Sequence, residues 1–247
     1  MLSTVPLFLD TCSQWSVTVL DLPTAYWHEM VDWLDSESFT FPTSLRLVII
    51  GGDKAEREKL AKWQEHLGQE SRLLNTYGPT EATVVASFAD LSSAPGTGKA
   101  NREVSIGRPV DNCKTYVLDP YMQPVPVGTY GELCIGGLGL ARGYLNMPGA
   151  TARGFVPNPF VAGPGARLYR TGDLARYRRD GTIEFSGRID HQVKIRGFRI
   201  EVGEIEAVLT EHRDVRETVL LVKRFAEGDE RLVAYVVPKG ERLSLIH

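Results

Sequence analysis

The sequence contains little cysteine and no cysteine or histidine pattern of a metal site. Cys12, Cys113 and Cys134 are far apart in the sequence and show no Cys-x-x-Cys spacing. None of the five histidines pairs with another at the spacing of metal ligands. These absences exclude a disulfide framework and a zinc site as organising features, and they favour a reducing, cytoplasmic compartment.

Excess positive charge and long hydrophobic runs are also lacking. The 28 lysines and arginines are balanced by 31 aspartates and glutamates, for a net charge of −3, which argues against a dedicated nucleic-acid binder. Residues 1–10 are apolar but have no basic leader and no run long enough for a membrane-spanning helix, so we expect neither a signal peptide nor a membrane partner. Residues 241–247 end in a mostly apolar run without a turn signal, and we expect a cut at this end.

Residues 17–77 alternate between strand and helix patterns. We predict strands at residues 17–20, 45–50 and 72–75, and a helix at residues 25–34. The segment 45–50 is almost continuously apolar, as is typical of a strand buried on both faces of a parallel sheet. Ligands bind such sheets beyond the carboxyl ends of the strands, which here carry polar or glycine-containing segments that begin at Asp21, Gly51 and Thr76.

A second helix is predicted after the glycine pair that ends the strand at 45–50. Asp53 is expected to cap this helix, with Glu56 three residues later completing a capping box. Leu60, Trp63 and Leu67 then follow at i, i+3 and i+7, so they should share one buried face of the helix.

The pattern changes twice after residue 103. Short strands separated by glycine and proline are predicted at 115–118, 131–135, 168–169 and 182–185, which is typical of an antiparallel, barrel-like region. A third pattern follows Asp190: a hairpin around Gly197, a helix at 202–210, and strands at 218–222 and 232–237.

The predicted fold is therefore α/β, with a mostly parallel βαβ-layered sheet, a small antiparallel β-barrel-like region and an incomplete α+β C-terminal subdomain. Residues 1–103 would form the second half of a large α/β core, and residues 104–187 the barrel-like part of that core. Residues 188–191 would form a hinge, and residues 192–247 a truncated C-terminal subdomain.

Two short segments concentrate side chains suited to binding a nucleotide. In residues 75–83, Tyr77 offers a flat ring for a base, Thr80 a hydroxyl for a phosphate, and Glu81 a hard oxygen ligand for Mg²⁺. In residues 169–173, Tyr-Arg-Thr-Gly-Asp, the final Asp173 can accept hydrogen bonds from two ribose hydroxyls. Each residue also has an ordinary structural alternative: a core aromatic, a carboxylate at a helix start, or a turn residue.

Together with residues 187–201, GRIDHQVKIRGFRIE, these segments match in order the motifs YGPTE, Y(K/R)TGD and GRxDxQVKIRGxRIE of adenylate-forming enzymes. Further matches lie at residues 106–109, and at 131–137 followed by 141–144. From Ser16 onward the chain resembles most closely an adenylation domain of a nonribosomal peptide synthetase.

The resemblance implies a role for each matching residue. Nucleotide contacts are implied for Gly52, Asp53, Lys54, Asn75, Tyr77, Gly78, Thr80, Asp173 and Arg188. The amino-acid pocket would be lined by Asp21, Ile49, Gly51, Thr76, Val84 and Val85. The catalytic set would be Thr80, Glu81 and Lys194, with Glu81 holding the metal and Asp190 acting as the hinge.

The implied reaction joins an amino acid and ATP to give aminoacyl-AMP and pyrophosphate, followed by transfer to a carrier thiol. The implied cofactors are ATP or AMP, Mg²⁺ and the phosphopantetheine of a peptidyl carrier domain. Arginines and lysines between residues 167 and 199 would contact triphosphate and carrier, although a solvated basic face or a nucleic-acid patch is an alternative.

Two motifs of the family do not occur in the sequence: a Ser/Thr/Gly-rich phosphate loop ending in Pro-Lys-Gly, and a late Asn-Gly-Lys motif. We therefore expect the chain to be truncated at both ends and these 247 residues to be inactive alone. The alternative is a non-catalytic nucleotide-binding or docking protein with the same fold.

Overall fold

The computed structural model describes residues 4–35, 40–67, 71–92, 103–162, 165–190, 193–195, 198–226 and 229–240. The chain forms two compact units, Met1–Ile189 and Asp190–His247. The second unit therefore begins at Asp190, the residue expected to act as a hinge.

The first unit contains, in chain order, α1 (Val5–Gln14), β1 (Val19–Pro23), α2 (Thr24–Asp32), the 3-10 helix η1 (Trp33–Asp35), β2 (Leu47–Gly51), α3 (Arg57–Leu67), β3 (Arg72–Tyr77), the 3-10 helix η2 (Thr80–Ala82), β4 (Ser87–Asp90), β5 (Ser105–Pro109), β6 (Cys113–Leu118), β7 (Gly131–Gly137), α4 (Pro148–Gly154), β8 (Phe155–Pro157), β9 (Arg167–Tyr177) and β10 (Ile183–Arg188). The second unit contains β11 (Val193–Ile195), β12 (Phe198–Ile200), α5 (Val202–Thr210), β13 (Val215–Ala226) and β14 (Asp229–Pro238).

One mixed sheet runs through the first unit in the order β1-β2-β3-β4-β5-β10-β9-β7-β6, with β8 paired to β9. Strands β1, β2 and β3 are parallel, as predicted, and the pairings from β3 onward are antiparallel. The fold is α/β as expected, but the parallel and barrel-like regions are continuous because β4, β5 and β10 pair in succession.

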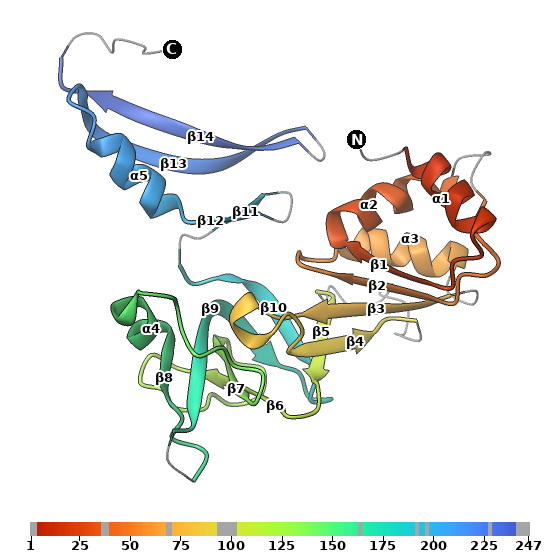
Figure 1. Ribbon diagram of the computed structural model, residues 1–247, viewed down its shortest axis with the longest axis horizontal. Helices are drawn as coiled ribbons and strands as arrows, with labels where there is room; N and C mark the ends of the chain where they lie inside the picture. Colours follow the sequence, from red (N-terminus) through yellow and green to blue (C-terminus); the bar gives the residue numbers. More distant parts are fainter. Residues whose placement is uncertain are drawn as a thin grey trace. The chain divides into compact units, whose positions relative to one another are not determined.

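Helices α1, α2 and α3 cover one face of the parallel strands (Figure 1). Leu60, Trp63 and Leu67 are buried on α3, as their spacing predicts, with exposures of 2%, 1% and 5%. Trp63 lies against Trp27 of α2, with ring centroids 6.0 Å apart. Each large apolar side chain buried here contributes about 2–3 kcal/mol of transfer free energy, so this face is the main core of the unit.

The predicted capping box at Asp53 is wrong. Helix α3 begins at Arg57, and the Asp53 carboxylate accepts the neighbouring Lys54 N–H at 2.8 Å. The Glu56 N–H donates to His28 Nε2 of α2 at 3.1 Å, and Ala55 is buried. This contact with a distant helix satisfies a backbone donor that a capping box would otherwise serve.

Two strand predictions also need correction. Asp21 lies inside β1, which continues to Pro23, so it is not at the strand end. The strand predicted at 168–169 is an 11-residue strand that runs through the Thr-Gly-Asp motif to Tyr177. Asp173 is therefore a strand residue and not a turn residue.

In the second unit, α5 spans the predicted residues, whereas β13 and β14 are longer than predicted. The Glu206 carboxylate of α5 accepts the Leu220 N–H of β13 at 2.8 Å, which joins the helix to the hairpin. Among the residues that the structure describes, no helix is long and apolar enough to cross a membrane.

Candidate functional site

The carboxyl ends of the three parallel strands meet at one edge of the sheet. Pro23, Gly51 and Thr76 stand next to one another in register there. A Cβ at Gly51 would lie 2.4 Å from the Thr76 hydroxyl oxygen, which donates to the Ile50 carbonyl at 2.8 Å. The glycine is thus required by the close approach of β3.

Strand alternation divides the candidate residues of this edge between two faces. Asp21 pairs with Ile49, and Gly51 pairs with Thr76, so these four lie on the face away from the buried residues Leu20 and Val48. On β3, the neighbours of Thr76 in sequence, Asn75 and Tyr77, point to the opposite face. The pocket candidates of the strands therefore share one face, while two nucleotide candidates share the other.

A carboxylate, a phenol and a guanidinium from three strands form a buried cluster. The Tyr77 hydroxyl of β3 donates to Asp173 Oδ2 of β9. Arg188 Nη1 of β10 donates to Asp173 Oδ1 at 2.9 Å, and its Nη2 donates to the Thr171 carbonyl at 3.0 Å. Asp173 is 7% exposed. The structure thus brings together three of the predicted nucleotide-binding residues.

The tyrosines of the site are held in their neutral form. Burial raises the pKa of Tyr77 well above its usual value, and the nearby Asp173 carboxylate raises it further. Burial also raises the pKa of Tyr144, with a contribution from its hydrogen bond to Glu81. Both hydroxyls therefore keep their protons near neutral pH and act as donors.

This shift predicts a loss of stability at alkaline pH. The folded pKa of Tyr77 lies above its unfolded value of 10.0, so its contribution is complete below that pH and is lost as the pH rises towards the folded pKa. We expect the wild-type chain to lose more unfolding free energy than Tyr77→Phe between about pH 9 and pH 11, as measured by urea unfolding. Equal losses of unfolding free energy in the two proteins would contradict a raised pKa of Tyr77 in the folded state.

The Thr-Gly-Asp segment is held by Glu132 of β7, a residue to which the sequence analysis gave no role. Glu132 accepts from Arg170 Nη2 at 2.6 Å and from the Gly172 N–H at 3.2 Å. The Asp173 N–H donates to the Thr171 hydroxyl oxygen at 3.0 Å. Glu132 lies in the family match at residues 131–137, but its bond to Arg170, 38 residues later, could be found only from the folded structure.

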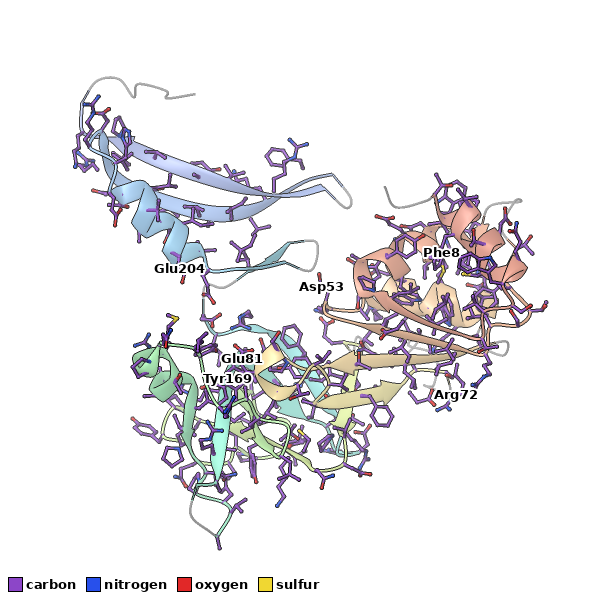
Figure 2. The ribbon with its side chains drawn as sticks, viewed as in Figure 1. Phe8, Asp53, Arg72, Glu81, Tyr169 and Glu204 are labelled. Carbon is purple, nitrogen blue, oxygen red and sulfur yellow. The ribbon has the colours of Figure 1, made fainter. Side chains whose placement is uncertain are left out.

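Glu81 lies in η2, is 7% exposed, and accepts a 2.5 Å hydrogen bond from the Tyr144 hydroxyl at Oε1. The same hydroxyl lies 3.4 Å from the hydroxyl of Tyr169. Figure 2 labels Glu81 and Tyr169, which lie close to each other in the first unit. Tyr144 is the last residue of the family match at residues 141–144, but the sequence alone gave it no role.

The backbone after Glu81 is strained. Thr83 and Val84 have φ of 60° and 69°, a region that β-branched residues rarely adopt. A Cβ at Gly78 would lie 2.5 Å from the Val84 carbonyl oxygen, so glycine permits this return of the chain. Val84 is also 70% exposed. Strain of this kind costs about 1–3 kcal/mol per residue and is concentrated at functional sites.

Other predicted nucleotide-binding and catalytic residues lie outside the cluster of Tyr77, Asp173 and Arg188. Asn75 is 3% exposed and donates from Nδ2 to the Ser105 carbonyl at 2.9 Å. Lys54 forms a 2.9 Å ion pair with Glu103. The remaining placements are as follows: Gly52, Asp53 and Thr80 are exposed, and Lys194 lies in β11 of the second unit with its side chain outside the described residues.

A cavity of about 200 Å³ lies beside η2. Val85, a pocket candidate, lines it together with Thr83, Cys113 and Leu140. It is smaller than the cavities that usually hold drug-sized ligands, about 300 Å³ or more. Among the described residues, no group of three or more His, Cys, Asp or Glu side chains could hold a metal ion.

A family model for AMP-binding enzymes matches residues 2 to 145. The dimodular nonribosomal peptide synthase of Bacillus subtilis is 44% identical over 236 residues, which cover 95% of this chain and 10% of that protein. Tyrocidine synthase 1 of Brevibacillus parabrevis is 44% identical over 229 residues, which cover 93% of this chain and 20% of that protein. The chain thus spans a small part of these relatives.

Solved structures agree with these matches. An artificially fused adenylation–PCP di-domain NRPS from Klebsiella oxytoca matches with a TM-score of 0.77 and 28% identity, covering 99% of this chain and 44% of that chain. A second NRPS protein containing adenylation and PCP domains matches with a TM-score of 0.80 and 28% identity, covering 96% of this chain and 46% of that chain.

Proposed function

The chain belongs to the family of AMP-binding enzymes, and on that premise we propose that it is part of an amino-acid-activating adenylation domain of nonribosomal peptide synthesis. The domain would join an amino acid to ATP, giving aminoacyl-AMP and pyrophosphate, and pass the aminoacyl group to a carrier thiol. The observation that carries the proposal is the buried cluster of Tyr77, Asp173 and Arg188, which unites base-, ribose- and phosphate-binding chemistry.

In this proposal the nucleotide is bound mainly by the first unit. Tyr77 stacks on the adenine, and the Asn75 Oδ1 accepts from its amino group while Nδ2 remains bonded to Ser105. Asp173 accepts from the ribose hydroxyls, and Arg188, already held 2.9 Å from Asp173, contributes positive charge towards the phosphate. The remaining proposed contacts come from Gly52, Asp53, Lys54, Gly78 and Thr80.

The chemistry of Glu81 fits a magnesium ion that arrives with the nucleotide. Mg²⁺ is usually held by one or two carboxylates together with substrate phosphates, and Glu81 is a carboxylate in the segment that also carries Thr80. When bound, the ion would neutralise phosphate charge. The carboxylate of Glu81, oriented by its hydrogen bond from Tyr144, would be its protein ligand.

The amino acid would bind on the opposite face of the strands, against Asp21, Ile49, Gly51 and Thr76, with Val84 and Val85 at its boundary. We further propose that Asp190 is the hinge of the second unit, and that Lys194 of β11 serves the thioester-forming step. A peptidyl carrier domain with its phosphopantetheine would be the partner, as the pairing of adenylation and PCP domains in the proteins of similar structure supports.

These assignments predict how the 247 residues discriminate nucleotides. The proposed contacts reach the base, the ribose and the α-phosphate, so AMP should bind within about threefold of ATP. GMP should bind far more weakly, because guanine has a carbonyl oxygen, an acceptor, at the ring position where adenine carries the amino group that donates to Asn75 Oδ1. Titration calorimetry of AMP, ATP and GMP measures this. ATP binding tenfold tighter than AMP, about 1.4 kcal/mol, would contradict the contact set. Equal binding of GMP and AMP would contradict the base site.

A further inference from the structure

We propose that Tyr144 is a positioning residue for the Glu81 carboxylate and, through it, for the divalent cation that accompanies the nucleotide. The inference rests on the proposed function, because Glu81 is the metal ligand only within that proposal. It adds a residue and a contact to which the sequence analysis assigned no role.

The contact between the two side chains is short and shielded from water. The Tyr144 hydroxyl lies 2.5 Å from Glu81 Oε1, and Glu81 is 7% exposed. Hydrogen bonds from a hydroxyl to an ionised carboxylate fall at about 2.5–2.7 Å and are roughly twice as strong as neutral ones. Tyr144 therefore constrains the orientation of the Glu81 carboxylate.

Tyr144 is itself held in place by several contacts. Its ring packs edge-on against Phe155, with centroids 5.8 Å apart, and its N–H donates to the Thr151 hydroxyl oxygen at 2.9 Å. Gly143 has φ of 147°, and a Cβ there would lie 2.4 Å from the Thr151 methyl carbon. The glycine lets the chain pass close to Thr151, and this contact fixes the backbone position of Tyr144.

The same loop also binds the main chain of Glu81 and the side chain of Thr83, two residues later. The Ala141 N–H donates to the Glu81 carbonyl at 2.8 Å, and the Thr83 hydroxyl donates to the Gly139 carbonyl at 2.6 Å. Residues 139–144 thus hold both the main chain and the carboxylate of the η2 segment. This arrangement orients a ligand before any cation arrives.

An ionised carboxylate offers about four lone-pair sites, so a carboxylate that accepts a hydrogen bond can also coordinate a cation. Partners that orient a metal-binding carboxylate typically change metal affinity by about 10- to 100-fold when they are removed. Removing the Tyr144 hydroxyl should therefore weaken cation binding without removing any ligand atom.

The test compares Tyr144→Phe with the wild-type chain. The variant keeps the ring against Phe155 and loses only the hydroxyl. We expect Mn²⁺ affinity in the presence of AMP, measured by water proton relaxation, to fall about 10- to 100-fold. AMP affinity without a cation should stay within about twofold. Tyr130→Phe is the matched control, because it removes a hydroxyl that donates to the Glu184 carboxylate at 3.1 Å, and it should leave Mn²⁺ affinity unchanged.

Glu81→Gln separates this inference from the proposed function. Weaker Mn²⁺ binding in Glu81→Gln but not in Tyr144→Phe would overturn the role of Tyr144 and leave the metal role of Glu81 standing. Unchanged Mn²⁺ binding in Glu81→Gln, or none in the wild type, would overturn both. An equal loss of Mn²⁺ and cation-free AMP affinity in Tyr144→Phe would show a merely structural residue. The double variant should bind Mn²⁺ no more weakly than Glu81→Gln.

Discussion

Replacing Asp173 with alanine is expected to weaken AMP binding by about 100-fold or more. Hydrogen bonds to an ionised group contribute about 1.5–3 kcal/mol each, and the proposal assigns two ribose hydroxyls to this carboxylate. A loss of about 3 kcal/mol corresponds to about two powers of ten in the dissociation constant. Titration calorimetry with AMP measures the effect.

The same substitution should also lower stability, because Tyr77 and Arg188 both lose their shared acceptor in a buried setting. Removing one partner of a buried ion pair costs about 3 kcal/mol or more. The matched control is Glu184→Ala, which removes a buried carboxylate that accepts from Arg176 at 2.6 Å and Arg178 at 3.0 Å. The control should lose stability to a similar degree in urea unfolding and keep its AMP affinity. Equal loss of AMP binding in both variants would contradict a specific role for Asp173.

Gly107→Ala is expected to destabilise the first unit by more than about 4 kcal/mol, a size reserved for severe backbone and core disruption. An added Cβ would lie 1.6 Å from the Phe88 carbonyl oxygen of β4, and the φ of Gly107 is 79°. The atoms that the Cβ would meet belong to the main chain of β4, so no side-chain movement relieves the overlap. Urea unfolding followed by circular dichroism measures the loss.

The effect should be large because of where Gly107 lies in the sheet. It belongs to β5, which pairs with β4 on one side and with β10 on the other, and so joins the part of the sheet that contains the parallel strands to the barrel-like part. Gly128→Ala is the matched control, since Gly128 has φ of 91° with nothing within 4 Å of the added Cβ. It should lose only about 1–2 kcal/mol, the cost of the left-handed backbone. Similar losses of unfolding free energy in the two variants would show that the overlap with β4 is not the cause of the destabilisation.

Local pattern was enough to predict much of the fold. The periodicity of Leu60, Trp63 and Leu67 predicts a buried helical face, and the apolar run at residues 45–50 predicts a central parallel strand. The helical prediction follows from the chain's own repeat, because a helix returns to the same face every 3.6 residues. The apolar run correctly predicts a parallel strand, but successive residues of β2 are alternately half-buried and buried, so the expectation of full burial on both faces is wrong. The motif order likewise indicated the family, since five short segments match it in sequence.

The arrangement of the candidate site depended on tertiary structure. Tyr77 and Asp173 are 96 residues apart in sequence and meet because β4, β5 and β10 curl the sheet between β3 and β9. The bond from Tyr144 to Glu81 spans 63 residues, and the failure of the capping box at Asp53 depends on His28 from another helix. Hydrogen bonds of this kind form between side chains and backbone groups whose distance no local repeat encodes. Local periodicity therefore specifies which face of each element is buried, whereas only the packed sheet specifies which polar groups meet.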